Sequence, residues 1–200
     1  MKRFLIFLLS ITAVCSFEDA ASQNLGSREI EVRQENRIDS RKSAKKSSKK
    51  EQRAAEREVA YVSALALLNA RDFVLEGNKL SMPDGSSLAV FSDVNYIMMK
   101  GDKAVVQVNP GISGGPNGMG GITLEGSVID FQRTTDKRGN VKLKYTVMTT
   151  GGSAEVELTL MAGGDKANAI ITPKLRSARV IMFGKLLATE NSRVFKGFSM

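Results

Sequence analysis

The chain has 200 residues, with 29 Lys and Arg against 21 Asp and Glu, a formal net charge of +8, one cysteine and no histidine. Without an imidazole, most nucleophilic and metal-based enzyme chemistry is excluded, and a single cysteine cannot form a disulfide framework. The length allows one domain that is large enough to be stabilised by a hydrophobic core.

Residues 1–15 have the layout of an export signal. The basic start Lys2-Arg3 is followed by an apolar run from Phe4 to Val14 and then by small residues at which a peptidase can cut. The run is too short to cross a bilayer as a helix, which takes about 20 residues. We therefore expect an exported protein, in the periplasm or associated with the outer membrane, with no transmembrane helix in the mature chain.

Two fates are open for Cys15. In a lipoprotein signal, Cys15 becomes the first mature residue and its acyl chains tether the protein to the membrane. Thr12 and Val14 depart from the usual lipoprotein pattern, and ordinary cleavage nearby, for instance after Cys15, would leave the protein untethered. Glu18 and Asp19 resemble the acidic sorting signal of surface lipoproteins in Bacteroides-like bacteria.

Residues 16–47 show no sustained apolar periodicity, which predicts a basic, partly disordered linker. Positive charge is densest in residues 41–50, which hold six cations and no anion. Such a block can contact anionic lipid headgroups, polyanionic glycans or nucleic acid, but a solvated spacer is the favoured interpretation. Nucleic acid is not expected, because no aromatic residue for stacking on bases lies between Phe17 and Tyr61.

An amphipathic helix is predicted over residues 48–71. Ser48 and Glu51 match a capping box at its start, and glycine and proline are absent as far as Ala70. Apolar residues recur at three- and four-residue spacing and should dock on the rest of the chain. This apolar stripe comprises Val59, Tyr61, Val62, Leu65, Ala66 and Leu68.

From residue 72 to residue 190, apolar residues recur at every second position, which predicts an antiparallel β domain. The clearest hairpin alternates from Val141 to Val147 and again from Ala154 to Leu160. A two-residue Gly151-Gly152 turn would pair Val147 with Val156, Tyr145 with Leu158 and Leu143 with Leu160, leaving Lys144 diagonal to Glu157 on the wet face.

A second hairpin is predicted around Gly101-Asp102, and short strands recur at about ten-residue spacing. These further strands are residues 73–76, 87–91, 127–135, 166–172 and 178–187. The predicted fold is mainly β: an antiparallel meander that curls into a barrel-like, lipocalin-like sheet and is preceded by one N-terminal helix. Residues 191–200 form a tail without a clear pattern.

The glycine-rich stretch 111–121 is the main candidate binding segment. Its first five residues match a nucleophile elbow, which needs a histidine that the chain lacks. The stretch could also form a phosphate-binding nest of backbone N–H groups, but it lacks the lysine and the following helix of a P-loop. A long loop between strands is therefore favoured, and long loops are often functional. The candidate residues are Gly111, Ser113, Gly115, Asn117 and Met119.

Other polar and apolar groups give weaker candidates. Glu155 and Glu157 share one face with lysines, which indicates a surface ion-pair ladder and not a catalytic pair. Met98 and Met99 with Tyr96 either line an apolar cavity or, as we favour, fill the core. No catalytic residue, metal site or cofactor is expected, and the protein is not expected to be an enzyme.

The order of these segments resembles an envelope domain of Bacteroides-like bacteria, domain of unknown function 4251. The resemblance covers roughly residues 52–187 and includes the strand around Phe73, the hairpin at 94–106 and the hairpin ending at Leu160. Family members carry aromatic residues where this chain has Val108-Asn109-Pro110-Gly111. The resemblance implies a barrel-like antiparallel fold and an envelope location, and it brings no activity.

The sequence is therefore interpreted as that of a non-enzymatic binding module of the cell envelope. Its partner would be an envelope protein, or an apolar or anionic envelope ligand, that engages either the sheet interior or the glycine-rich stretch. The alternative is a structural or assembly factor that acts through the helix and the basic linker.

Overall fold

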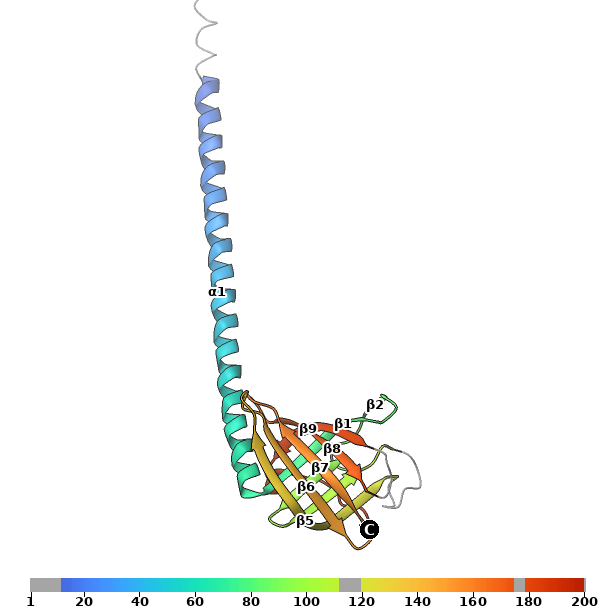
Figure 1. Cartoon of the computed structure of the whole chain (residues 1–200). Helices are drawn as coiled ribbons and strands as arrows, with labels where there is room; N and C mark the ends of the chain where they lie inside the picture. The colour runs from blue at the N-terminus through green and yellow to red at the C-terminus, as the bar shows by residue number, and fades with distance from the viewer. Residues whose placement is uncertain (1–11, 112–119, 175–178, 200) are drawn as a thin grey trace, which may run out of the picture. The chain divides into compact units, whose positions relative to one another are not determined.

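The computed structural model describes residues 12–111, 120–174 and 179–199, which divide into two units with a boundary between Ala54 and Ala55 (Figure 1). The helix α1 (Thr12–Ala70) contributes to both units. The other elements are β1 (Asp72–Ser81), β2 (Ser87–Ala89), β3 (Tyr96–Lys100), β4 (Lys103–Val108), β5 (Ile122–Thr135), β6 (Val141–Thr149), β7 (Gly152–Leu160), β8 (Lys166–Pro173), β9 (Val180–Leu187) and the short 3-10 helix η1 (Thr189–Asn191).

Helix α1 is much longer than predicted, because it begins at Thr12 and not at Ser48. The structure therefore corrects the prediction of a partly disordered linker over residues 16–47. Within Thr12–Ala54 there is no proline and only Gly26 among glycines, while Ala, Glu, Arg and Lys, all good helix formers, are abundant. The described side chains of this unit, at residues 37, 41, 42 and 44–54, are all exposed, in agreement with the missing apolar period.

The predicted capping box is wrong, since Ser48 lies inside the helix. Its hydroxyl donates to the Lys45 carbonyl at 3.3 Å, and the Ser47 hydroxyl donates to the Ala44 carbonyl at 2.8 Å. Back-bonding of this kind is typical of serines within a helix.

The eight strands β1 and β3–β9 form a closed antiparallel barrel (Figure 1). Each strand pairs with the next along the chain, and β1 pairs with β9 from Val74↔Leu187 to Ser81↔Ile181. The short β2 pairs with the far end of β1, at Lys79↔Ala89. Closure leaves the barrel strands without a free edge, and it confirms the predicted mainly β, barrel-like fold with one N-terminal helix.

The β6–β7 hairpin has the predicted faces but a different register. The structure pairs Val147 with Ala154, Tyr145 with Val156 and Leu143 with Leu158, so the predicted pairs are wrong by two residues. The turn is Thr150-Gly151, one residue earlier than the predicted Gly-Gly turn. A shift of two residues keeps every side chain on its own face, since the strand period is two.

The barrel interior is filled with apolar side chains. Those with no exposed surface on the inner face include Phe73, Leu75, Ile97, Met99, Leu143, Tyr145, Leu158 and Met182. Met99 therefore fills the core as favoured, whereas Tyr96 belongs to a second buried cluster with Val74 and Val105, against which Met98 packs. Eight-stranded barrels are just wide enough for side chains to fill them, and the inner residues named above leave no accessible surface.

The last turns of α1 pack against the barrel core. Ala64 and Leu68 are buried in the core, and the Tyr61 hydroxyl donates to the carbonyl of Gly139 in the β5–β6 connection. Val59 and Val62, which were predicted to lie on the docking face, are exposed. The docked face is centred on Ala64 and Leu68, four residues apart, with Tyr61 and Leu65 packed beside them, and the predicted residue Ala66 is also exposed.

Candidate functional site

The structure describes only part of the predicted binding segment. Ser113, Gly115, Asn117 and Met119 lie outside the described residues, as does residue 178, where the last strand was predicted to start. Cys15 lies within α1. Gly111 is described, and with φ +80° it adopts the left-handed conformation that glycine favours.

Both ends of the glycine-rich stretch are held firmly. At the first end, the Gly111 N–H donates to Asn109 Oδ1 at 2.9 Å, and the Asn109 N–H donates to Asn95 Oδ1 at 2.7 Å. At the second end, a Cβ added to Gly121 would lie 1.9 Å from the carbonyl oxygen of Val108. Only glycine allows the two backbones to approach this closely.

Three buried polar side chains, Asn95, Gln107 and Thr123, lie beside this stretch; we call them the amide clamp. All three have no exposed surface. Gln107 Nε2 donates to the carbonyls of Val94 at 3.1 Å and Phe195 at 2.8 Å. Gln107 Oε1 accepts the Thr123 hydroxyl at 2.9 Å and the Gly197 N–H at 2.8 Å. The amide of Gln107 thus uses both of its donors and both acceptor positions.

Asn95 also forms hydrogen bonds with Phe91 and Gly77. Its Nδ2 donates to the carbonyl of Phe91 at 2.9 Å, and its backbone carbonyl accepts the Gly77 N–H at 2.8 Å. The amide clamp therefore joins the β2–β3 connection, the start of the glycine-rich stretch and the C-terminal tail. A buried network in which every group is paired fixes its segments in one arrangement.

The C-terminal tail, residues 188–199, follows the outer surface of β1, β3, β4 and β5. Ser192 Oγ donates to Glu76 Oε1 at 2.7 Å, and the Phe195 N–H donates to the carbonyl of Asp93 at 2.7 Å. Val194 packs against the outer cluster of Val74, Tyr96 and Val105. Although the sequence shows no pattern there, the tail is ordered because it covers this apolar cluster.

An ion pair adds to the tail contacts. Lys196 Nζ lies 2.9 Å from Glu125 Oε2, and this hydrogen bond, assisted by the charge of Lys196 and by Ser199 and Lys103, holds the pKa of Glu125 below its ordinary value. Burial, with a smaller effect of the Glu125 charge, raises the pKa of Tyr96 to about 12. Tyr96 is therefore a neutral phenol at physiological pH.

Three phenylalanines are exposed on the segments that the amide clamp joins: Phe91, Phe195 and Phe198, which we call the exposed phenylalanines. Their exposed fractions are 81%, 63% and 79%. Exposed apolar side chains are individually common, but large aromatic ones on rigidly held segments are typical of binding surfaces.

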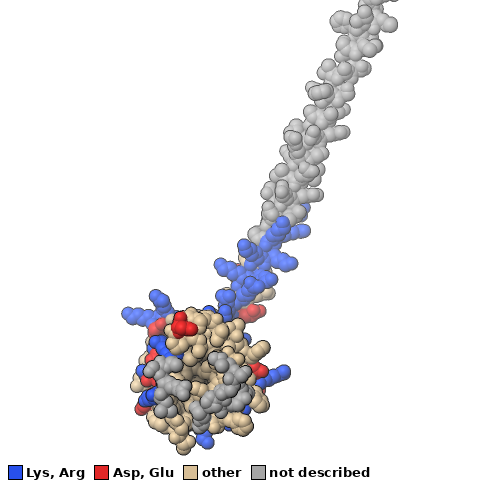
Figure 2. All heavy atoms as spheres, turned by 90° about the vertical axis from the view of Figure 1, so that its right-hand side faces the viewer, with Lys and Arg blue, Asp and Glu red and all other residues tan. Residues whose placement is uncertain are grey.

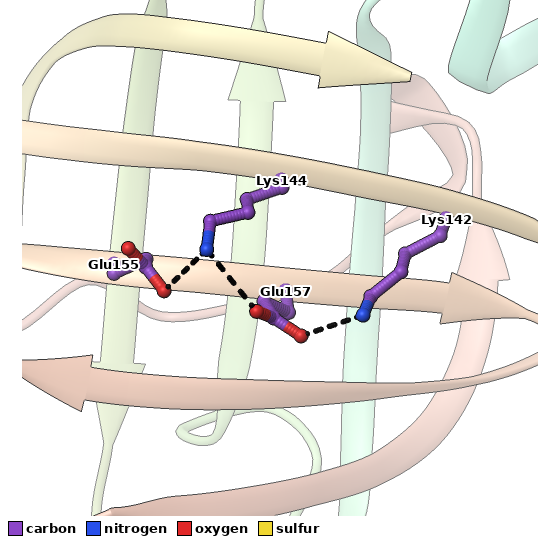
Figure 3. Close-up of polar contacts among 4 residues, drawn as sticks. All are labelled: Lys142, Lys144, Glu155 and Glu157. Atoms are coloured by element: carbon purple, nitrogen blue, oxygen red, sulfur yellow. Dashed lines mark hydrogen bonds and ion pairs between the residues drawn. The ribbon is translucent and has the colours of Figure 1, made fainter. Parts of the chain in front are cut away.

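The predicted ion-pair ladder on β6 and β7 is confirmed (Figure 3). Lys144 Nζ lies 3.1 Å from Glu155 Oε1 and 3.4 Å from Glu157 Oε1, and Lys142 Nζ lies 2.8 Å from Glu157 Oε2. The hydrogen bond from Lys142 and the contacts with Lys144 lower the pKa of Glu157. Glu157 is therefore ionised at neutral pH and is not itself the protonated acid that a carboxylate-pair hydrolase needs.

The hydroxyl of Tyr145 is the buried side-chain polar atom that lacks a hydrogen-bond partner among the described residues. Burial raises the pKa of Tyr145, and its ring stacks on Phe131 with the centroids 6.2 Å apart.

No group of three or more potential metal ligands occurs among the described residues. In the same part of the chain, none of the helices is both long and apolar enough to cross a membrane.

Comparison with known proteins agrees with the resemblance found in the sequence. Residues 55–186 match the family model described as domain of unknown function (DUF4251). The chain is also similar to the crystal structure of a DUF4251 family protein from Bacteroides eggerthii, with 36% identity, 71% of this chain and 96% of that chain covered, and a TM-score of 0.63. No curated protein matches the chain. The amide clamp lies inside the matched residues, and the tail lies after them.

Proposed function

Because this chain belongs to the DUF4251 family, whose members share a domain of unknown function, we propose a function from the chain's own geometry. It is a non-enzymatic binding module of the bacterial cell envelope. The exposed phenylalanines bind an apolar segment of an envelope protein, and the barrel is the rigid scaffold that holds them.

The observation that supports this proposal is the amide clamp beneath the exposed phenylalanines. Gln107 connects β4 to the backbone of Phe195, and Asn95, directly before β3, bonds to the backbone of Phe91. Because the backbone of these segments is already fixed, a partner does not have to order it on binding, so more of the apolar burial contributes to affinity. Aromatic residues are the usual anchors of such contacts.

The barrel interior is the less favoured location for a ligand. Side chains such as Phe73, Leu143 and Met182 have no exposed surface and already fill it. A ligand would have to displace packed core residues, which are as dense as an organic crystal. The export layout of residues 1–15 supports the envelope location, and the absence of histidine supports a non-enzymatic role.

The proposal is tested with the triple variant Phe91→Ser, Phe195→Ser and Phe198→Ser. After mild cross-linking in cells, the wild-type protein should co-purify with a defined envelope protein, and the triple variant should not. The matched control replaces the exposed apolar residues Ile129 and Met148 on β5 and β6 by Ser, and it should retain the partner. Retention by the triple variant, or equal loss in the control, would refute the proposal.

The alternative function is a structural or assembly factor that acts through α1. It is favoured by the exposed, charged surface of residues 41, 42 and 44–53. Deleting residues 28–50 distinguishes the two: loss of the partner with this deletion, together with retention in the triple phenylalanine variant, would indicate the assembly role.

Tethering through Cys15 is a separate part of the proposal. The intact mass of the mature protein distinguishes an acylated Cys15 from ordinary cleavage after it. Fractionation of cells reports the location independently: the protein should be found in the envelope fraction, and its recovery from the cytoplasm would refute the proposed export.

A further inference from the structure

The helical state of residues 41–54 places cations on one side of α1. With 3.6 residues per turn, the side chains of Lys45, Lys46, Lys49, Lys50 and Arg53 fall within an arc of about 140°; we call these five residues the basic face. All five are exposed, and the blue side chains along the described part of α1 are visible in Figure 2. Glu51, the carboxylate within residues 44–54, projects from the opposite side.

We propose that the basic face binds anionic lipid headgroups at a membrane surface. Its five cations recur over nine residues, which is about 12 Å of helix axis, so they present a compact band of charge on one side of the helix. A cation near an anionic membrane contributes about 1 kcal/mol of attraction. A flexible linker would spread the same charges in all directions, whereas a helix aims them at a single surface.

The side of α1 opposite the basic face indicates how deeply the helix would enter a membrane surface. Ala44, Ser47, Ser48 and Glu51 are small or polar, and within residues 44–54 no large apolar side chain occurs. Helices that insert into the interface need a broad apolar face, so this one would lie on the headgroups without entering the acyl region.

The composition of the basic face favours headgroups over nucleic acid. Four of the five cations are lysines, which act as compact hydrated point charges, and only Arg53 can form a planar bidentate pair. Sequence-tolerant binding to single-stranded nucleic acid also requires aromatic side chains for base stacking. Residues 18–60 contain none.

The first test measures binding of the full-length protein to lipid vesicles. Vesicles of phosphatidylcholine with about one-third phosphatidylglycerol should bind the protein, while pure phosphatidylcholine vesicles report whatever the apolar N-terminal run contributes. Replacing the five basic-face cations by Gln should weaken the binding to anionic vesicles by about 100-fold or more. Raising the salt from about 0.05 M to about 0.5 M should have a similar effect, because it screens the charges.

A matched control removes the same charge from the barrel unit. Lys100, Lys137, Arg138, Lys166 and Lys174 are all exposed, and their replacement by Gln should leave vesicle binding within about twofold of the wild type. Equal loss in this control would show that net charge suffices and would overturn the proposal.

A position-swapped variant tests the helical geometry itself. Ala44→Lys with Lys46→Ala, and Ser47→Lys with Lys49→Ser, keep the composition but distribute the cations around the helix. Binding to anionic vesicles should fall about tenfold while the helical circular-dichroism signal is unchanged. Unchanged binding would refute a one-sided contact.

A competition experiment tests the assigned partner class. If short RNA or heparin bound the full-length protein more tightly than the anionic vesicles did, the membrane assignment would be wrong. The inference does not depend on the exposed phenylalanines, since the five-Gln variant should keep the protein partner that the triple phenylalanine variant loses.

Discussion

Gln107 is a buried polar residue in an apolar strand, and its role follows from its contacts in the folded protein and not from the local sequence pattern. It interrupts the apolar run from Ala104 to Val108, and on strand alternation alone it is an ordinary outward-facing polar residue. Its partners include Phe195 and Gly197, which lie about ninety residues later in the chain. A polar residue in an apolar strand is a signal that can be read from sequence, but the identity of a distant partner is not.

Truncation of Gln107 should destabilise the protein. Gln107→Ala leaves the carbonyls of Val94 and Phe195, the Thr123 hydroxyl and the Gly197 N–H without their buried partner. We expect the free energy of unfolding to fall by about 2–4 kcal/mol in denaturant titrations. The control Gln132→Ala, on the exposed part of β5, should change it by less than about 0.5 kcal/mol. Equal effects of the two substitutions would contradict the role of the amide clamp.

Gly121 should not tolerate a side chain. In Gly121→Ala the new Cβ would lie 1.9 Å from the Val108 carbonyl oxygen, which is backbone and cannot rotate away. Thermal unfolding should report a loss of about 3 kcal/mol. In contrast, Gly164→Ala should be nearly neutral, because a Cβ at Gly164 would meet no atom within 4 Å. A neutral Gly121→Ala variant would show that β4 and β5 can separate there.

At the scale of elements, the tail and α1 show where sequence patterns fail. Neither the tail nor residues 16–47 have an apolar period, yet both are ordered in the structure. The tail lies on the outer cluster of Val74, Tyr96 and Val105. Strand alternation treats these outward-facing residues as solvated, so their burial could not be predicted without knowing that residues 188–199 return to cover them.

Docking of the tail should weaken in acid. The pKa of Glu125 is lowered by Lys196, so the ionised carboxylate stabilises the docked tail fully above the unfolded-state pKa of about 4.3, and this stabilisation is lost as the pH falls through the lower folded-state pKa. Both side chains are partly exposed, so the contribution is about 0.5 kcal/mol or less.

Hydrogen exchange at the amides of Phe195 and Gly197, corrected for intrinsic rates, measures this effect. Protection should decrease below about pH 4 in the wild type. In Glu125→Gln, protection should be lower at neutral pH and should not decrease further in acid through this pair. A wild-type tail whose protection is independent of pH in that range would contradict a role for the ion pair.

In the β6–β7 hairpin, the buried face could be predicted from the sequence but the strand register could not. The alternation of Leu143, Tyr145 and Val147 fixes which face is buried, and the structure confirms it. The turn depends on local chemistry: the Thr149 hydroxyl accepts the Gly151 N–H at 3.1 Å and donates to the Gly152 carbonyl at 3.0 Å. This side-chain bonding moves the turn one residue earlier, and the pairing follows.

At the scale of the whole β unit, the closed barrel follows from the sequence because a long antiparallel meander must remove its edges. The meander, the inward faces and the ion-pair ladder all depend on local alternation, so they could be predicted. The closing pair β1–β9 and the amide clamp join residues about one hundred positions apart, so no local pattern specifies them. The candidate residues within 112–119 lie outside the described residues and stay predictions.

We propose that a partner binds at the outer surface held by the amide clamp and not in the barrel interior. Site-specific photo-cross-linking in living cells tests it most directly. A photoreactive phenylalanine analogue placed at Phe91, Phe195 or Phe198 should give the same discrete cross-linked species, and the analogue at the exposed control positions Thr134 and Lys137 should not. Absence of any adduct at all three phenylalanine positions, or the same adduct at the control positions, would contradict the account.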